Sequence, residues 1–221
     1  MLKETNIALK KAIHKSQHCQ RNWELSKSIP ESDMNTIIEA ATQCPSKQNI
    51  AYYRAHFITD RKIIEEIHSW TKGFRMDLTD VNDEMSLTNT QVLANLLICF
   101  EAYSDPSKAI RNSENYAMHV DRTLDTGYDA RKLVERDRNM AVGVAAGYVN
   151  VTSALLGYST GCCACFQPQK VQEILNLQGE PLLLMGVGFS GAGRPRREHH
   201  EDSSITFPTL RKQQIPVQIW K

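Results

Sequence analysis

One long helical pattern, rich in small residues, limits most strongly how this chain can fold. It covers residues 138–156 and includes Gly143 and Gly147 together with several alanines. An interior glycine costs a helix about 1 kcal/mol relative to alanine, so helix propensity alone does not explain the pattern. Because small side chains allow another backbone to approach closely, we expect this helix to pack tightly against a second element.

Shorter helices and a small number of strands surround this helix in the sequence. Apolar residues at helical spacing, and short alternating or continuous apolar runs, identify these segments. The predicted helices are 4–15, 33–44, 61–70 and 169–175, with a short helix or turn at 88–93, and the predicted strands are 53–59, 96–100 and 182–187. Ser32 is a candidate N-cap for the second helix, which Pro45 ends. Since strands and helices do not alternate regularly, the sequence predicts an α+β fold.

The remaining chain adds an insertion and an arm to one domain that spans residues 1–221. Residues 103–135 are polar, mix both charges and show weak periodicity. They predict an insertion with one or two helices that covers the site or a partner subunit. The tail 203–221 contains two prolines and ends with the largely apolar stretch 216–220. An apolar end on a polar tether suggests an arm that docks elsewhere, for example as an edge strand on a partner.

Charge and hydropathy exclude several classes of protein. The formal net charge of +1 gives no electrostatic reason to expect nucleic acid or an anionic membrane as a partner. No apolar run reaches the ~18 residues that a membrane helix needs. The N-terminal stretch 1–12 mixes charged with apolar side chains, unlike a signal peptide. We therefore expect a soluble, cytoplasmic protein.

The six cysteines are expected to be reduced. Cys162, Cys163 and Cys165 are too close along the chain for favourable mutual pairing. The others lie within helix- or strand-like patterns, at Cys19, Cys44 and Cys99. Spacing of this kind does not indicate a disulfide framework. A metal site would need a further ligand, whereas thiol chemistry is an alternative role for the cluster.

A glycine-rich stretch after the last strand raises the alternative of a dinucleotide site. Gly186-Val187-Gly188-Phe189-Ser190-Gly191 matches the pattern Gly-x-Gly-x-x-Gly. That motif must open a helix inside a β-α-β unit and lead to an acidic residue about 20 positions later. Here Gly193-Arg194-Pro195 prevents a helix, and little chain remains. We interpret the stretch as a strand exit that leads to a basic loop.

Four polar segments occur in an order that resembles a known family. They are His18-Cys19-Gln20-Arg21-Asn22-Trp23, Pro45-Ser46-Lys47-Gln48-Asn49, Gly161-Cys162-Cys163-Ala164-Cys165 and Arg194-Pro195-Arg196-Arg197. Together they resemble the nitroreductase family of FMN-dependent oxidoreductases, over most of the chain. The resemblance implies a central mixed or antiparallel sheet flanked by helices. It also implies an intertwined homodimer, with FMN in clefts between the subunits.

The resemblance assigns one group of residues to the FMN phosphate. In the family, the first helix ends in a basic-x-Ser-x-basic pattern. The matching residues here are 17–21, with Gln17 at the first basic position and Cys19 in place of the serine. A phosphate dianion requires cations or helix N-terminal amides. The candidates are His18, Cys19, Arg21, Arg194, Arg196 and Arg197.

A second group would contact the isoalloxazine ring and the ribityl chain. The family's Pro-Ser-x-x-Asn turn reaches the flavin that is held mainly by the other subunit, which implicates Pro45, Ser46 and Asn49. Amides before the buried strand would lie against the pyrimidine edge or the ribityl chain. Backbone N–H groups after the long helix would face N5 and O4. The matching residues are Asn89, Gln91, Cys163 and Ala164.

The activity that the resemblance implies is hydride transfer. NAD(P)H would deliver hydride to flavin N5, and a nitroaromatic, quinone or similar acceptor would then take the electrons. No side chain is a candidate acid or base. Two alternatives stay open. One is a related flavin enzyme with another acceptor, as in dehalogenation or flavin cleavage. The other is a non-catalytic flavin-binding or redox-sensing protein, which the cysteines and Gln17 favour.

Overall fold

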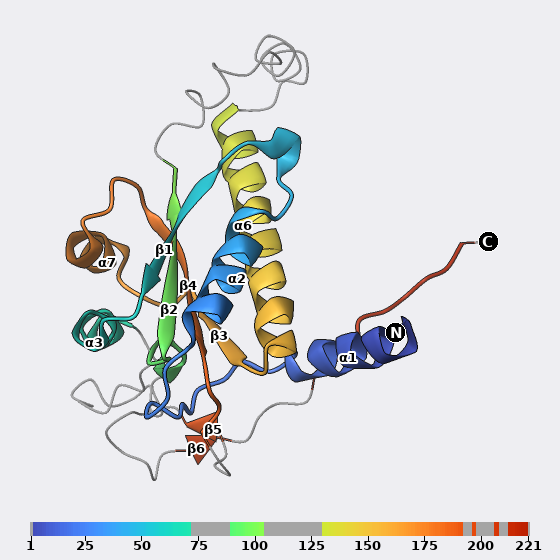
Figure 1. The fold of residues 1–221 in the computed structure, drawn as a ribbon. Coiled ribbons are helices and arrows are strands. Elements are labelled where there is room, and N and C mark those ends of the chain that lie inside the picture. Colours follow the sequence, from blue (N-terminus) through green and yellow to red (C-terminus); the bar gives the residue numbers. More distant parts are fainter. Residues whose placement is uncertain are drawn as a thin grey trace.

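Figure 1 shows the fold of the chain in a computed structural model. The structure describes residues 2–71, 89–103, 130–191, 196–197, 206–207 and 212–220. The helices are α1 (Leu2–Lys15), α2 (Glu31–Thr42), α3 (Arg61–Ser69), α6 (Ala130–Leu155) and α7 (Pro168–Leu175), with short 3₁₀ turns η1 (Lys47–Asn49) and η2 (Thr90–Val92). The strands are β1 (Tyr53–Ile58), β2 (Leu96–Ala102), β3 (Ser159–Cys163), β4 (Pro181–Gly188), β5 (Arg196–Arg197) and β6 (Thr206–Phe207).

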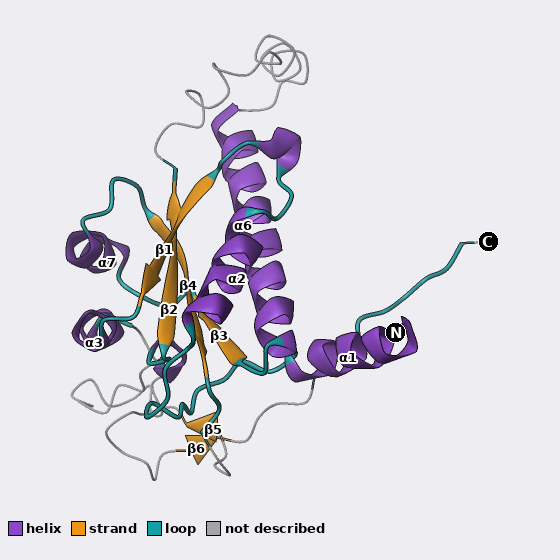
Figure 2. Cartoon of the chain, viewed as in Figure 1, coloured by secondary structure: helices purple, strands orange, loops and turns teal. Residues whose placement is uncertain are grey.

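The strands β1 to β4 form one antiparallel sheet in the order β1-β2-β4-β3. Leu97 of β2 pairs with Ile58 on one side and with Gly186 on the other, and Gly186 pairs in turn with Gly161 of β3. Helices cover both faces of this sheet, as Figure 2 shows. The predicted α+β fold with an antiparallel sheet flanked by helices is therefore confirmed.

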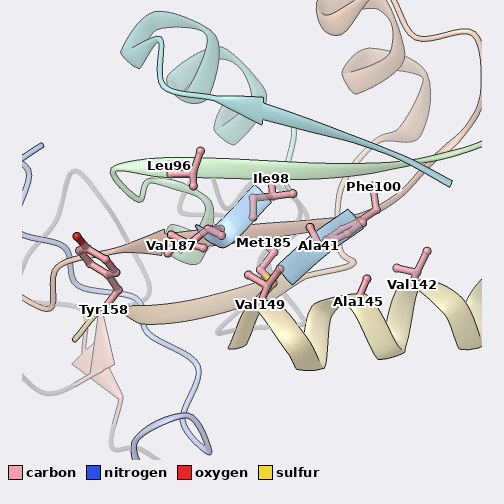
Figure 3. Packing of buried hydrophobic residues seen from close by; sticks show 11 residues of the cluster. Ala41, Leu96, Ile98, Phe100, Val142, Ala145, Val149, Tyr158, Met185 and Val187 are labelled. Carbon is pink, nitrogen blue, oxygen red and sulfur yellow. The ribbon is translucent and has the colours of Figure 1, made fainter. Parts of the chain in front are cut away.

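Strand β2 is buried along its whole length because it packs against helices on both faces. Leu96, Ile98 and Phe100 join a core cluster with α2 and α6, which Figure 3 shows. Leu97 and Cys99 join a second cluster with α3 and α7. Full burial of a large apolar side chain contributes about 1.5–3 kcal/mol. A strand buried on both sides reads as a continuous apolar run, which is the pattern that predicted it.

The small-residue helix is α6, and it is longer than predicted because it begins at Ala130. Its inner face packs on α2 and the sheet through Val142, Ala145 and Val149. Its outer face carries exposed apolar side chains, namely Met140, Val144, Tyr148 and Leu155. A Cβ added at Gly143 or Gly147 would meet nothing within 4 Å. Within the described residues, no second backbone makes the close approach that these glycines permit.

Two local predictions are wrong. Ser32 does not cap α2, which begins at Glu31 and has Pro30 at the N-cap position without a side-chain hydrogen bond. Proline suits a helix start because its φ is already fixed near the helical value. Residues 159–163, which are not among the predicted strands, form strand β3. Their own sequence, Ser-Thr-Gly-Cys-Cys, favours a strand only weakly, but pairing with β4 supplies the context on which strand formation depends.

Parts of the predicted insertion and arm fall outside the described residues. Of the insertion, 104–129 is not described, and 130–135 belongs to α6. Of the arm, 212–220 contains no helix or strand and leads away from the packed layers in Figure 1. Its exposed apolar side chains are Ile215, Val217, Ile219 and Trp220. Among the described helices, none combines the length and the apolar character needed to cross a membrane.

Candidate functional site

The segment between α1 and α2 runs along the outer edge of β3 and the end of β4. The N–H of Gln20 donates to the carbonyl of Thr160 at 2.7 Å. The N–H of Gly191, just after β4, donates to the carbonyl of Asn22 at 2.8 Å. These backbone hydrogen bonds place residues 18–21, which include the predicted phosphate ligands His18, Cys19 and Arg21, at one end of the sheet.

Two buried amides connect this segment to the cysteine-rich end of β3. Arg21 Nη1 donates to Gln91 Oε1 at 2.6 Å, and Gln91 Nε2 donates to the carbonyl of Cys162 at 3.2 Å. Asn89 Nδ2 donates to the carbonyl of Cys165 at 3.1 Å. Asn89 and Gln91 are 5% and 3% exposed, and buried amides are normally hydrogen-bonded in this way. Asn89 and Gln91, which the family resemblance places against the pyrimidine edge or the ribityl chain, therefore hold the 162–165 segment in this structure.

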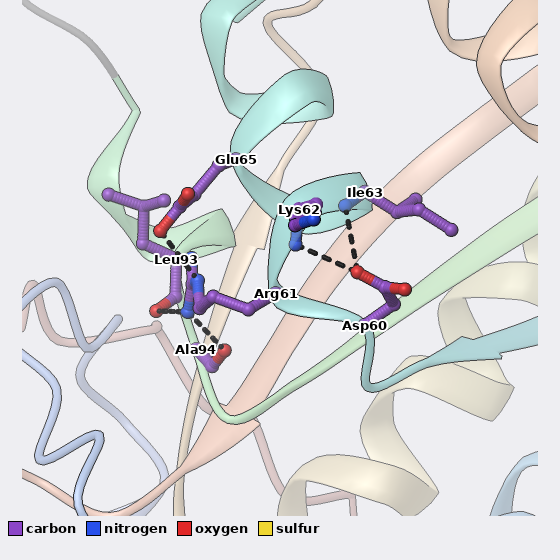
Figure 4. A network of polar contacts seen from close by, with 7 residues as sticks. All are labelled: Asp60, Arg61, Lys62, Ile63, Glu65, Leu93 and Ala94. Carbon is purple, nitrogen blue, oxygen red and sulfur yellow. Dashed lines mark hydrogen bonds and ion pairs between the residues drawn. The ribbon is translucent and has the colours of Figure 1, made fainter.

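The turn that carries these amides, η2, is anchored from α3, as Figure 4 shows. Arg61 Nη1 donates to the carbonyls of Leu93 and Ala94 at 3.0 and 3.2 Å. Burial lowers the pKa of Arg61, and the Glu65 carboxylate opposes this shift. Asp60 caps the start of α3 by accepting from two backbone N–H groups. Because hydrogen bonds from a charged donor are stronger than neutral ones, Arg61 holds the end of η2 firmly.

Gly161 allows the 18–21 segment and η2 to approach β3 closely. A Cβ at this position would collide with the carbonyl oxygen of Gln20 and lie 2.7 Å from Gln91 Cβ. It would also lie 3.4 Å from Cys19 Sγ. A side chain at residue 161 would therefore force the three segments apart.

The cysteines of this region differ in exposure. Cys163 lies in the core on the α3 and α7 side, and burial raises the pKa of its thiol to about 11. Cys19, Cys162 and Cys165 are exposed, as is Ala164. Sequence reasoning did not assign Cys162 to the flavin site and did not use its Cys-x-x-Cys spacing with Cys165. Among the described residues, no cluster of cysteine, histidine and carboxylate side chains could hold a metal ion.

The predicted 45–49 turn lies at the other end of the sheet. It leads into β1, whose first residue, Tyr53, pairs with Ala102 at the end of β2. In contrast, η2 precedes Leu96 at the start of β2. The length of β2 from Leu96 to Ala102 corresponds to about 20 Å. The turn therefore does not meet the 18–21 and 162–165 segments within one chain.

The turn itself is fixed by local contacts. Ser46 Oγ donates to the carbonyl four residues later at 2.8 Å, and Asn49 adopts a left-handed φ of 55°. Pro45 and Asn49 are exposed. Lys47 Nζ lies 2.6 Å from Asp137 Oδ2 of α6. Burial raises the pKa of Asp137, but the hydrogen bonds from Lys47 and the adjacent arginine outweigh burial and lower it.

A groove of about 760 Å³ lies beside this turn and β1. Its lining includes Ser46, Asn49, Tyr53, Arg54 and His56. Strand β1 is an edge of the sheet, and an edge strand offers backbone groups with which a further strand can pair. The groove therefore adjoins an edge that could accept another segment.

The arginine cluster is described only in part. Arg196 and Arg197 form β5, which pairs with β6, and Arg194 lies outside the described residues. The chain leads into β5 shortly after Gly191, whose N–H bonds to the segment between α1 and α2. The structure thus brings together three predicted segments, which are 18–21, 89–91 and 162–165.

Comparisons with known proteins agree with one another. A family model described as the Nitroreductase family matches residues 15–189. The structure of a nitroreductase family protein from Streptococcus pneumoniae TIGR4 is 21% identical, with a TM-score of 0.63 over 88% of this chain and 98% of that chain. A protein from Exiguobacterium sibiricum 255-15, assigned as a nitroreductase and solved in complex with FMN, is 15% identical to this chain. The TM-score is 0.58, and the match covers 90% of this chain and 96% of that chain. No curated protein matches the chain in sequence.

Proposed function

Because the chain belongs to the nitroreductase family, we propose that it is an FMN-dependent oxidoreductase. It passes hydride from NAD(P)H through the flavin to a nitroaromatic, quinone or similar acceptor. The observation that carries this proposal is a junction at the end of the sheet, where hydrogen bonds of 2.6 and 3.2 Å join Arg21, Gln91 and the carbonyl of Cys162. This junction unites segments that the family resemblance assigns to the phosphate and to the ring.

The side chains at the junction fit a phosphorylated flavin. A phosphate dianion needs nearby cations, and Arg21 is oriented by Gln91 while His18 is exposed close by in the chain. The β5 arginines follow the strand end that bonds to the same segment. In the 162–165 segment, which would face the isoalloxazine ring, Ala164 is exposed. Its small side chain leaves room for this flat apolar ring.

The flavin, when bound, supplies the hydride-accepting chemistry. The chain's own part is to position it. Asn89 and Gln91 hold the backbone of 162–165, so its N–H groups keep a constant direction. Donors that are fixed before reaction stabilise developing charge more than mobile donors, because they need no reorganisation. We assign no side chain as an acid or base.

The proposal includes a homodimer, because one chain cannot bring its 45–49 turn to its own junction. The two lie about 20 Å apart along the sheet, so a partner's turn would complete the site. We assign the outer face of α6 to the dimer contact, since contiguous exposed apolar side chains commonly mark an interface. The open positions at Gly143 and Gly147 would allow a second helix to approach.

A non-catalytic flavin-binding or redox-sensing protein is the second candidate function. It is favoured by Cys19 in place of the serine and by Gln17 in place of the first basic residue. Steady-state oxidation of NADPH in the presence of a quinone separates the two candidates. Turnover supports the enzyme, and bound flavin without turnover supports the binding protein.

Binding of FMN to the purified full chain tests the cofactor. We expect a yellow protein that NADPH bleaches without oxygen and that a quinone restores. Arg21→Gln should weaken FMN binding by at least about tenfold, since hydrogen bonds to charged groups contribute about 1.5–3 kcal/mol. Lys170→Gln is the matched control, because Lys170 pairs with Glu173 on α7, away from the junction. A wild-type chain that does not bind FMN overturns the proposal.

A further inference from the structure

A single side chain of the long helix joins three elements beside the predicted phosphate segment. Asn150 lies near the C-terminal end of α6, where α1 ends and β3 begins (Figure 1). Its Nδ2 donates to the carbonyl of Ser16, just after α1, at 3.0 Å. Its Oδ1 accepts from the hydroxyl of Thr160 in β3. Both ends of the Asn150 amide therefore connect α6 with its neighbours.

The same threonine holds the chain a second time after α1. The N–H of Gln20 donates to the carbonyl of Thr160 at 2.7 Å. Ser16 and Gln20 are thus both bonded to the pair formed by Asn150 and Thr160. We call these three hydrogen bonds the 16–20 clamp. Between the two held positions, residues 17–19 are exposed, so the clamp fixes a short loop that faces solvent.

Both residues that form the base of the clamp are set in packed elements. Thr160 is 6% exposed and lies in a strand that pairs with β4. Asn150 follows Val149, which is buried in the core cluster between α6 and the sheet. In addition, Lys15 Nζ donates to the carbonyl of Gly157, just after α6. A helix end leaves carbonyls without intrahelical partners, and here the neighbouring elements supply them, so the end of α1 is fixed in the chain alone.

We propose that Asn150 and Thr160 are positioning residues for the flavin phosphate, a role that rests on the proposed function. The resemblance matches the phosphate-binding pattern to residues 17–21, where Gln17 and Cys19 replace a basic residue and a serine. With fewer charged donors, phosphate binding depends more on groups that are held in place beforehand. A loop that is already ordered loses less conformational freedom on binding, and the clamp supplies this order.

This role predicts a difference between two flavins. FMN and riboflavin share the ring and the ribityl chain, but only FMN carries the phosphate. The 162–165 segment, which would face the ring, is held by Asn89 and Gln91 rather than by the clamp. Loss of the clamp should therefore weaken the binding of FMN and leave the binding of riboflavin unchanged.

Flavin titration of the full chain tests the role. Asn150→Ala removes the amide and should weaken FMN binding by about tenfold, which corresponds to about 1.4 kcal/mol. Thr160→Val removes only the hydroxyl and keeps the shape of the side chain, so its loss should be smaller. Thr160→Ser keeps the hydroxyl and should bind FMN like the wild type. The double variant should bind FMN no more weakly than Asn150→Ala, because the partner of the hydroxyl is already absent.

Hydrogen exchange of the chain without flavin tests the clamp itself. The N–H of Gln20 is bonded to the Thr160 carbonyl, so it should be protected in the wild type and lose protection in Asn150→Ala. Ser153→Ala is the matched control, because Ser153 is a buried residue on the next turn of α6. Within the described residues, its hydroxyl has no hydrogen-bond partner. This control should keep both the wild-type FMN affinity and the protection of Gln20.

The outcomes separate the inference from the function on which it rests. Unchanged FMN affinity in Asn150→Ala, or an equal loss of FMN and riboflavin binding, overturns the positioning role. Unchanged protection of Gln20 in the same variant overturns the clamp. If the wild type binds neither flavin, the proposed function fails, while hydrogen exchange still decides whether the clamp fixes the loop.

Discussion

At the scale of single residues, Gly161 determines whether the junction can form. A Cβ there would collide with the Gln20 carbonyl and lie 2.7 Å from Gln91 Cβ. Gly161→Ala should therefore lower the free energy of unfolding by about 1–3 kcal/mol, as overpacking does, and it should also weaken FMN binding. Urea unfolding and flavin titration measure the two effects. Ala164→Ser is the control for stability, since exposed substitutions usually change it by less than about 0.5 kcal/mol. Equal stability of Gly161→Ala and the wild type would show that the segments separate without cost.

At the scale of elements, the Glu101 carboxylate joins β1, β2 and the chain before β4. It lies 2.7 Å from His56 Nε2 and accepts from the N–H of Gly179, and it is 1% exposed. Burial raises the pKa of Glu101, but the hydrogen bonds from His56 and Gly179 outweigh burial and hold it below 4.5. A carboxyl whose pKa is lowered by folding stabilises the protein above its unfolded pKa. That stabilisation is lost as the pH falls through the folded pKa.

Glu101→Gln should therefore lower the free energy of unfolding by about 1–3 kcal/mol near neutral pH, where the wild-type carboxylate is charged. The difference between variant and wild type should shrink as the pH falls below 4.5. Denaturant unfolding over a series of pH values measures it. Glu173→Gln is the control, because its exposed pair with Lys170 should contribute about 0.3–0.5 kcal/mol. A difference that is constant with pH would contradict the assignment.

At the scale of the whole molecule, the outer face of α6 determines the proposed assembly. Val144→Glu places a charge among the apolar side chains of this face, and an unpaired charge is unfavourable in a contact from which water is excluded. The variant should sediment as a monomer under conditions in which the wild type is a dimer, and it should lose FMN. Glu173→Lys, on the exposed surface of α7, should remain a dimer. A monomeric wild type that still binds FMN would contradict the proposal.

The sequence predicts the elements whose residues carry their own signal. The apolar run of β2 and the small-residue pattern of α6 are both found where the sequence places them. Strand β3 could not be predicted from Ser-Thr-Gly-Cys-Cys, because its conformation depends on pairing with β4. The predicted start of α2 was also wrong, because Ser32 is a common capping residue but Pro30 occupies the N-cap position.

For the candidate site, the sequence orders the segments but does not show their contacts. The position of Arg21 after α1 follows from the motif, and the structure places it against Gln91. The backbone partners of Asn89 and Gln91 could not be anticipated, because they depend on how η2 sits beside β3. The separation of the 45–49 turn from the junction likewise follows from the direction of β1, which no local pattern contains.

The two rims of the sheet, formed by the edge strands β1 and β3, are not equivalent. This difference limits how copies of the chain can aggregate. At the β3 rim, the Thr160 carbonyl already accepts from Gln20, whereas β1 borders a groove. Growth of a fibre by strand addition requires both rims of every copy to be available. A molecule with one occupied rim can add a strand at the other and then stop, so strand exchange would yield closed pairs rather than filaments.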